Sequence, residues 1–294
     1  MKTILLTGAT GFLGSNLAHK LVASGHRVLV LKRPSSNLDR LAAILPALSL
    51  YDIQGTDLSE PFKVHGKVDA VIHTATCYGR NGETTSEIFE ANTVFPLILL
   101  ETATHFNTDT FFNTDTILYK YLNGYALSKN HFFEWGKLFA DSQKIRFVNI
   151  RLEHIYGPGD NASKFTTHVI KSCLANVPEL KLTPGEQKRD FIYIDDVIAA
   201  YEVLLKKADN QAELFQEYDL GSGNAVTIRE FVETIHTLTG STTRLNFGAL
   251  PYRKNEIMNS EANIERLKLL GWRCQTNLFN GIGKTMRYEK ELQQ

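Results

Sequence analysis

The sequence predicts an α/β protein with a doubly wound parallel sheet and a smaller α/β lobe toward the C-terminus. In the first half, short runs that are apolar on both faces alternate with helical patterns, as in parallel sheets that helices cover on both sides. A glycine-rich turn joins the first such run to the first helical pattern. After Tyr156 the alternation ends, because Gly157, Pro158 and Gly159 interrupt the chain.

The expected elements follow from hydrophobic periodicity. Segments rich in Val, Ile, Leu and Phe are expected to be strands, and segments with apolar residues at helical spacing are expected to be helices. The expected strands are residues 2–7, 27–32, 48–53, 69–75, 110–114 and 145–151. The expected helices are residues 12–24, 38–45, 87–105 and 124–141.

The change of pattern also predicts two lobes. Residues 1–156 form the larger one, to which segments around 196–240 return, and residues 157–294 contribute mainly to the other. The smaller lobe is drawn mainly from 157–195 and 240–262. With 294 residues, 43% of them hydrophobic, the chain has enough apolar material for a full core.

The composition argues against nucleic-acid and membrane partners. The formal net charge is zero, with 32 basic and 32 acidic residues, so no overall field favours a polyanion or a charged membrane. The three cysteines lie far apart and the nine histidines show no metal-ligand spacing, so we expect no disulfide framework and no metal site. The N-terminal apolar run is too short for a signal peptide or a membrane helix, which indicates a cytoplasmic protein.

The turn after the first expected strand has the spacing of a dinucleotide-binding site. Glycines there permit a tight turn close to a pyrophosphate, and the N–H groups at the start of the next helix face the phosphates. An ordinary glycine-rich turn is the alternative, but the flanking strand and helix, and a second strand about twenty residues on, favour the cofactor site. The residues expected to bind the cofactor are Gly8, Thr10, Gly11, Phe12, Leu13 and Gly14.

The end of the second expected strand indicates NADPH rather than NADH. An NAD site usually offers Asp or Glu there to bind the ribose 2′-hydroxyl. This chain has Lys32 and Arg33, followed shortly by two serines, and no acid nearby in the sequence. A carboxylate would repel a 2′-phosphate, whereas a guanidinium would bind it. A solvated basic strand end is the alternative.

Three residues are candidates for catalysis. Tyr125 and Lys129 are four residues apart in an expected helix and share a face. The pKa of a free tyrosine is about 10, and a nearby ammonium lowers it, so that Tyr125 can exchange a proton at the working pH. Thr114 ends the fifth expected strand, where doubly wound folds bind ligands, and can donate to a substrate carbonyl. The alternatives are a surface Tyr–Lys pair and a threonine bonded within its own turn.

With these motifs, the chain resembles the extended short-chain dehydrogenase/reductase family, also called the NAD-dependent epimerase/dehydratase family, from Lys2 to Trp272. The resemblance makes the larger lobe an NADP-binding Rossmann domain and the smaller one a nucleotide-sugar-binding lobe. It also implies a homodimer through the helices expected at 87–105 and 124–141. Further segments that carry the resemblance are Asp57-Leu58, 71–75, Asn92, 151–159 and 189–196.

The same resemblance implies further site residues. Arg189 and Arg253 would hold a nucleotide diphosphate, a role that suits bidentate arginine. The further cofactor contacts would be Asp57, Leu58, Thr74 and Ala75, together with Tyr125 and Lys129. The substrate contacts would be Thr76, Asp115, Thr116, His154, Arg189, Arg253 and Glu256.

Departures within the family narrow the expected activity. Nucleotide-sugar 4,6-dehydratases typically have Thr-Asp-Glu at the end of the fifth strand, with the glutamate as the base. This chain has Thr114-Asp115-Thr116 there and lacks that glutamate. The chain is similar instead to the 4-ketoreductases that make CDP-abequose and CDP-paratose. The similar segments are 77–80, 113–116, 151–154, 157–160 with 164–165, 185–187 and 255–258. This similarity implies NADPH-dependent reduction of the 4-keto group of a nucleotide-linked deoxysugar, such as CDP-4-keto-3,6-dideoxyglucose, with Tyr125 as proton donor.

Other functions stay open at this point. One is the reduction of another nucleotide-4-keto-6-deoxy sugar, such as the dTDP form. A nucleotide-sugar 4-epimerase is another, although such enzymes usually hold NAD tightly and Lys32 and Arg33 argue against NAD. A non-catalytic NADP(H)-binding regulator would tend to lose the tyrosine or the lysine, and this chain keeps both. The nucleobase, the deoxysugar and the C4 configuration are not readable from the sequence.

Overall fold

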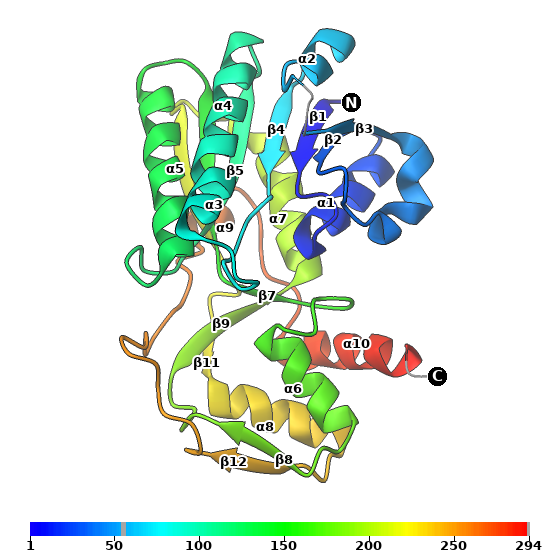
Figure 1. Cartoon of the computed structure of the whole chain (residues 1–294), viewed down its shortest axis with the longest axis vertical. Helices are drawn as coiled ribbons and strands as arrows, with labels where there is room; N and C mark the ends of the chain where they lie inside the picture. Colours follow the sequence, from blue (N-terminus) through cyan, green and yellow to red (C-terminus); the bar gives the residue numbers. More distant parts are fainter. Residues whose placement is uncertain (54–56, 293–294) are drawn as a thin grey trace. The chain divides into compact units, whose positions relative to one another are not determined.

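A computed structural model describes residues 1–53 and 57–292, which divide into two compact units (Figure 1). Unit 1 comprises Met1–Arg151 and Tyr201–Tyr218, and unit 2 comprises Leu152–Ala200 and the chain from Asp219 onward. The first boundary therefore lies five residues before the one expected at 156, and the returning segment is shorter than the expected 196–240.

Unit 1 is built on a seven-stranded sheet, and the predicted doubly wound fold is confirmed. Neighbouring strands from β5 to β3 pair in parallel; for example, Thr7 lies beside Leu31 on one side and His73 on the other. In sheet order, the strands are β10 (Phe215–Leu220), β6 (Arg146–Leu152), β5 (Thr110–Thr116), β4 (Ala70–His73), β1 (Thr3–Thr7), β2 (Arg27–Lys32) and β3 (Leu48–Asp52).

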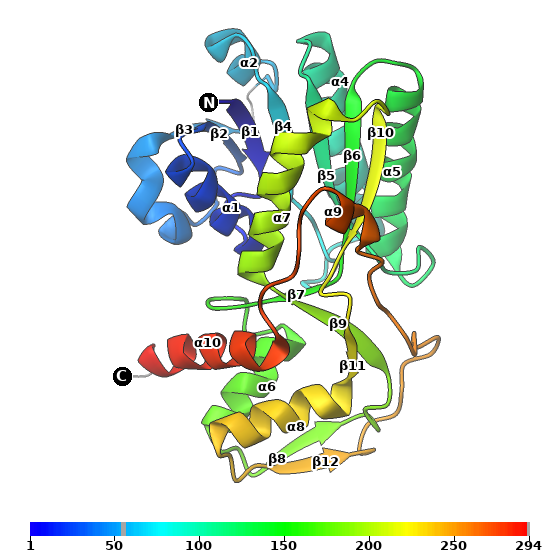
Figure 2. The same ribbon diagram turned by 180° about the vertical axis from the view of Figure 1, so that it is seen from behind.

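Helices cover both faces of this sheet. One face carries α4 (Phe95–His105) and α5 (Gly124–Asp141), and the other carries α1 (Phe12–Ala23) and the unit 1 part of α7 (Ile194–Lys207) (Figures 1 and 2). The shorter helices are η1 (Asp39–Ala47), α2 (Glu60–His65), α3 (Thr85–Phe89), η2 (Glu90–Val94) and η3 (Ala208–Asn210).

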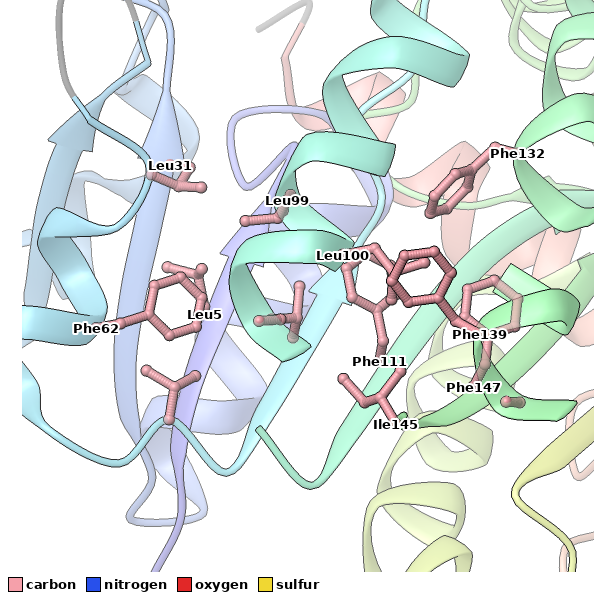
Figure 3. Close-up of a cluster of buried hydrophobic side chains, with 14 of the residues drawn as sticks. Leu5, Leu31, Phe62, Leu99, Leu100, Phe111, Phe132, Phe139, Ile145 and Phe147 are labelled. Carbon is pink, nitrogen blue, oxygen red and sulfur yellow. The ribbon is translucent and has the colours of Figure 1, made fainter. Parts of the chain in front are cut away.

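The core between the sheet and helices α2, α4 and α5 is rich in phenylalanine (Figure 3). Phe111 of β5 stacks on Phe147 of β6 with ring centroids 5.9 Å apart, and Phe132 of α5 meets Phe111 edge-on at 5.8 Å. Each such ring contributes about 1.5–3 kcal/mol through burial alone. This packing fixes α5, which carries Tyr125 and Lys129, against the strands that end at the candidate site.

Two expected helices differ in the structure. The segment 87–105 is divided into α3, the π-helical turn η2 and α4, with Pro96 in the first turn of α4. A π-helical turn often marks a functional position, and here it contains the fully buried Asn92. The segment expected at 38–45 is a 3-10 helix that includes Pro46.

Unit 2 holds two small sheets and four complete helices within its described residues. Its packing centres on Phe191 and Phe231, whose rings stack 3.9 Å apart. One sheet has the order β11 (Ala225–Thr227), β9 (Lys188–Tyr193) and β7 (His154–Tyr156), and the other pairs β8 (Glu179–Leu182) with β12 (Arg244–Phe247). The helices are α6 (Phe165–Leu174), α8 (Ile228–Thr239), α9 (Glu265–Leu269) and α10 (Leu278–Glu291).

Candidate functional site

The turn between β1 and α1 needs glycine at two positions. Gly8 has φ +71°, and a Cβ there would lie 2.6 Å from the Ala75 nitrogen; a Cβ on Gly14 would lie 2.1 Å from the Gly8 oxygen. Helix α1 begins after the exposed Gly11, and no side chain caps its N-terminus. Its first N–H groups are therefore available to phosphate oxygens. Thr10, Phe12 and Leu13 are half-buried around this turn.

The end of β4 is bonded to the same turn. The Thr74 hydroxyl donates to the Thr7 carbonyl at 2.7 Å, and the Ala75 nitrogen donates to the Thr7 hydroxyl at 3.3 Å. The structure thus brings the predicted cofactor residues Thr74 and Ala75 next to Gly8. Their bonds to Thr7 show that they shape the turn.

The end of β2 differs in one respect from the sequence-based expectation. Lys32 forms an ion pair with Asp52, which ends the neighbouring strand β3, so an acid does lie beside the predicted phosphate site. Arg33 is exposed, and no described acidic residue pairs with its guanidinium. Arg33 is therefore better placed than Lys32 to receive a 2′-phosphate. Asp57 and Leu58, the other two residues predicted to bind the cofactor, follow β3 in the chain. Asp57 is exposed and paired with Lys63, and Leu58 packs against the hydrophobic core.

Tyr125 lies in the first turn of α5, whose start is capped by Asn123 through a 2.9 Å bond from the Ala126 nitrogen. The ring of Tyr78 lies 5.0 Å from the Tyr125 ring, and the Arg80 guanidinium lies 5.1 Å above Tyr78. Burial raises the pKa of the Tyr125 phenol well above its usual value, whereas a hydrogen bond to Thr116 and the charge of Arg80 lower it. Burial thus favours the protonated phenol, and Thr116 and Arg80 are the groups that favour release of its proton.

Lys129 lies on the same helix as Tyr125 and is buried. Burial lowers the pKa of Lys129 to about 8, and its effect on the pKa of Tyr125 stays a prediction. The Lys129 ammonium nitrogen has no hydrogen-bond partner among the described residues. An unpartnered buried ammonium is costly, so this nitrogen marks a place where a ligand hydroxyl would be stabilised.

The two threonines at the end of β5 have separate partners. The Thr114 hydroxyl bonds the buried Tyr201 hydroxyl of α7 at 2.5 Å. The Thr116 hydroxyl interacts with the Tyr125 phenol. The structure therefore places the Thr116 hydroxyl beside the Tyr125 phenol and gives the Thr114 hydroxyl a partner in Tyr201.

A buried polar network lies beneath the site. The Asn149 amide donates to Asp115 and to Glu217, both at 3.1 Å, and accepts from the Asn113 amide at 2.8 Å. Burial raises the pKa of Asp115, and the charge of Lys129 opposes that rise. Asp115, predicted to contact substrate, therefore lies buried within the protein's own hydrogen bonds and acts on Lys129 through its charge.

Asn92 connects the segment after β4 to α5. Its amide oxygen accepts from the Cys77 nitrogen at 2.8 Å and from the Thr76 hydroxyl at 3.2 Å, and its amide nitrogen donates to Ser128 at 3.0 Å. Thr76, predicted to contact substrate, thus uses its hydroxyl within this connection. The three bonds fix the segment that carries Tyr78 and Arg80 relative to Tyr125.

In unit 2, Arg189 holds the chain segment that follows β12. Its guanidinium pairs with Glu256 and donates to the Ile257 carbonyl at 2.6 Å. Burial lowers the pKa of Arg189, and Glu256 and Glu153 oppose that effect. Arg253 lies in the same segment and is exposed. Arg253 is thus the more accessible of the two arginines predicted to hold a diphosphate, and Arg189 orders the segment that presents it.

His154 is the remaining predicted substrate contact, and it has an unexpected neighbour. The buried Glu153 carboxylate bonds His154 Nδ1 at 2.8 Å and accepts from the Ser260 hydroxyl at 2.5 Å. Sequence reasoning named His154 without this partner. Glu153 and His154 are adjacent in the chain, and this was the one feature of the sequence that could have suggested their bond. Adjacency alone does not show that the two side chains meet.

Two hollows open in unit 2. One of about 310 Å³ is lined by residues between Gln275 and Arg287, and one of about 240 Å³ includes Phe191 and Cys274 in its lining. Burial raises the pKa of the Cys274 thiol to about 12, so it is not a nucleophile. Within the described part of the chain, no group of His, Cys, Asp and Glu side chains could hold a metal ion. No helix in residues 1–53 and 57–292 is long and apolar enough to cross a membrane.

Known proteins resemble the chain over nearly its whole length. It is 36% identical over 292 residues to the CDP-abequose synthase of Salmonella muenchen, with 97% of each chain covered, and 27% identical to the dTDP-4-dehydro-6-deoxy-D-allose reductase of Streptomyces bikiniensis, with 83% of each covered. The UDP-glucuronic acid 4-epimerase of Bacillus cereus, solved with UDP-glucuronic acid and NAD, has the same fold with a TM-score of 0.85 at 24% identity, with 99% of this chain and 100% of that chain covered. The model of the NAD dependent epimerase/dehydratase family matches residues 4–221, and the chain belongs to that family.

Proposed function

We propose that the protein is an NADPH-dependent reductase of the 4-keto group of a nucleotide-linked deoxysugar. The observation that carries this proposal is the set of groups around Tyr125: its phenol beside the Thr116 hydroxyl, with the unpartnered Lys129 ammonium on the same helix. The 36% identity to a CDP-abequose synthase supports a CDP-linked 3,6-dideoxy sugar as substrate.

The residues of unit 1 fit a nicotinamide dinucleotide. The turn at Gly8 and Gly14 leaves no room for a Cβ, so that a pyrophosphate can approach the backbone. Lys129 would bond the nicotinamide ribose, and Arg33 would bond the 2′-phosphate that distinguishes NADPH from NADH. When bound, the cofactor supplies the hydride that reduces the keto carbon.

The protein's own part in the reaction is to supply a proton and to orient the carbonyl. Tyr125 donates its phenolic proton to the oxygen that becomes the C4 hydroxyl, and the hydroxyl of Thr116 orients that oxygen. Arg80 stabilises the tyrosinate that remains, because a cation near the phenol favours its charged form. Residues of unit 2, Arg253 foremost, bind the diphosphate of the substrate.

An assay of NADPH consumption tests this proposal. The purified protein would be given NADPH with CDP-4-keto-3,6-dideoxyglucose, and in parallel with dTDP- and GDP-4-keto-6-deoxy sugars. We expect one NADPH to be oxidised for each sugar reduced, with the CDP sugar preferred. A nucleotide sugar interconverted at C4 without net NADPH loss would indicate an epimerase. NADPH binding without turnover of any keto sugar would indicate a non-catalytic regulator.

We also propose a homodimer through α4 and α5. Ile98 of α4 is 46% exposed, and Trp135 and Leu138 of α5 are 45% and 52% exposed, although helix α5 buries another apolar face on the sheet. Large apolar side chains grouped on two neighbouring helices suit an interface between identical subunits.

A further inference from the structure

The pair Glu153–His154 joins a buried carboxylate to a half-exposed imidazole. The Glu153 side chain has no exposed surface, whereas 37% of the His154 side chain is exposed. The imidazole ring also meets the Phe191 ring edge-on at 5.8 Å. The imidazole of His154 is therefore held by the Glu153 carboxylate on one side and by the Phe191 ring on another, and part of the imidazole is exposed.

Folding alone does not account for Glu153. A buried carboxylate carries a large desolvation penalty, and an apolar side chain of similar volume often serves stability as well or better. Glu153 lies immediately before β7, and both of its oxygens are bonded, one to Ser260 and one to His154. The arrangement satisfies the carboxylate and at the same time fixes the imidazole.

The bond to Glu153 determines which nitrogen of His154 faces outward. An ionised carboxylate only accepts hydrogen bonds, so Nδ1 carries the proton that is donated to Glu153. In the neutral ring, Nε2 then has a free lone pair, and no described residue bonds it. An outward Nε2 of this kind accepts a hydrogen bond, and the negative charge behind the ring disfavours an anion at that position. A hydroxyl group is the ligand that suits it.

We propose that Glu153 is a positioning residue that holds His154 so that Nε2 accepts a hydrogen bond from a sugar hydroxyl of the nucleotide-linked ligand. This inference rests on the proposed function, because it takes the ligand of unit 2 to be a nucleotide sugar. The segment that carries Arg253 is bonded to both sides of this cluster: the Glu256 nitrogen donates to the Arg253 carbonyl at 3.1 Å, the Glu256 carboxylate pairs with Arg189, and Ser260 donates to Glu153 at 2.5 Å. We therefore place the sugars of a ligand whose phosphates meet Arg253 near His154.

The variants follow from the shapes of the side chains. His154→Asn keeps an amide near the position of Nδ1, which can still donate to Glu153, and removes Nε2. His154→Gln keeps a polar group near Nε2 and removes the donor to Glu153. Glu153→Gln removes the charge and keeps the shape. Glu261→Gln removes an exposed carboxylate of unit 2 that has no bond in the described structure, and it is the matched control.

Calorimetry would measure the affinity for CDP and CDP-glucose, with dTDP and dTDP-glucose as a second pair. We expect Glu153→Gln and His154→Asn to weaken binding by about 3- to 10-fold, the effect of one neutral hydrogen bond, and His154→Gln to weaken it less. In the His154→Asn background, Glu153→Gln should cause no further loss. Equal losses for CDP and CDP-glucose would place the hydroxyl on the ribose, and a loss with CDP-glucose alone would place it on the hexose.

A separate measurement determines which nitrogen of the His154 imidazole carries the proton. In protein labelled with ¹⁵N-histidine, NMR should show His154 with the proton on Nδ1, and Glu153→Gln should shift that signal while Glu261→Gln leaves it in place. A proton on Nε2, or a loss of affinity from Glu153→Gln that persists without His154, would overturn the positioning role. If the unmodified protein binds none of the nucleotides, both the proposed function and the nucleotide sugar as ligand of unit 2 are wrong. The NMR signal still tests whether Glu153 positions His154.

Discussion

The Thr114 hydroxyl is bonded to the Tyr201 hydroxyl at 2.5 Å, within unit 1. Tyr201 is buried, and burial raises the pKa of its phenol, while the bond to Thr114 opposes that rise. The threonine that interacts with Tyr125 is Thr116. We therefore expect different roles for the two residues, Thr114 in stability and Thr116 at the site.

Valine substitutions separate these roles. Thr116→Val should lower kcat by about tenfold or more, because it removes about 1.4 kcal/mol of transition-state stabilisation, and should leave stability almost unchanged. Thr114→Val should lower the free energy of unfolding by about 1–3 kcal/mol, because the buried Tyr201 hydroxyl loses its partner. Steady-state kinetics and urea unfolding would measure both. A loss of kcat confined to Thr114→Val would restore Thr114 as the residue that orients the carbonyl.

Lys129 should destabilise the fold at neutral pH. Its pKa falls from 10.5 to about 8 on burial, which corresponds to about 3 kcal/mol. Below pH 8 both the folded and the unfolded protein hold the proton, and the full cost applies; between about 8 and 10.5 the folded protein releases it first, so stability rises with pH. Lys129→Met should therefore be more stable than the unmodified protein at pH 7 while losing activity.

The extra stability of Lys129→Met should shrink as the pH rises from about 8 to about 10.5. Part of this extra stability is offset, because Asp115 loses the nearby cation. Urea unfolding at several pH values measures this difference. If Lys129→Met is less stable than the unmodified protein at pH 7, the ammonium has a stabilising partner and the ligand-binding role proposed for it loses its support.

The cofactor preference should depend on Arg33 more than on Lys32. NADPH should bind at least tenfold more tightly than NADH, a difference of about 1.4 kcal/mol. Arg33→Ala should remove most of that preference, and Lys32→Ala should remove less, because Asp52 already neutralises Lys32. Fluorescence titration with both cofactors measures the ratio. Equal dissociation constants in the unmodified protein would rule out the predicted 2′-phosphate site.

The proposed dimer should depend on the exposed face of α5. Light scattering at micromolar concentration should give twice the mass of the chain, and Trp135→Glu should yield a monomer that still binds NADPH, since Trp135 is 45% exposed and lies outside the cofactor residues. A monomeric mass for the unmodified protein would contradict this arrangement.

The Rossmann fold was predictable from the sequence because its strands and helices repeat a local pattern. The helix at 124–141 and the strand at 27–32 have the bounds expected from periodicity alone. The division of the segment 87–105 was not predictable from local periodicity, since Asn92 in the π-helical turn bonds Thr76 and Cys77, which lie elsewhere in the chain.

The site was predictable only where its residues lie in one segment. Gly8 to Gly14, and Tyr125 with Lys129, have a fixed spacing that the sequence displays. The ion pair of Lys32 with Asp52 and the bonds from Asn149 to Asp115 and Glu217 join neighbouring strands. Such pairs depend on strand register, which the sequence does not display.

The central claim is that Tyr125 donates the proton in the reduction, and Tyr125→Phe tests it most directly. The substitution removes one hydroxyl and keeps the ring that packs on Tyr78. The measurement is kcat for NADPH-dependent reduction of the keto sugar, with NADPH affinity and the free energy of unfolding followed in parallel. We predict a fall in kcat of roughly 10²–10⁴, the range for loss of a positioned general acid, with little change in affinity or stability. Turnover close to that of the unmodified protein would contradict the account.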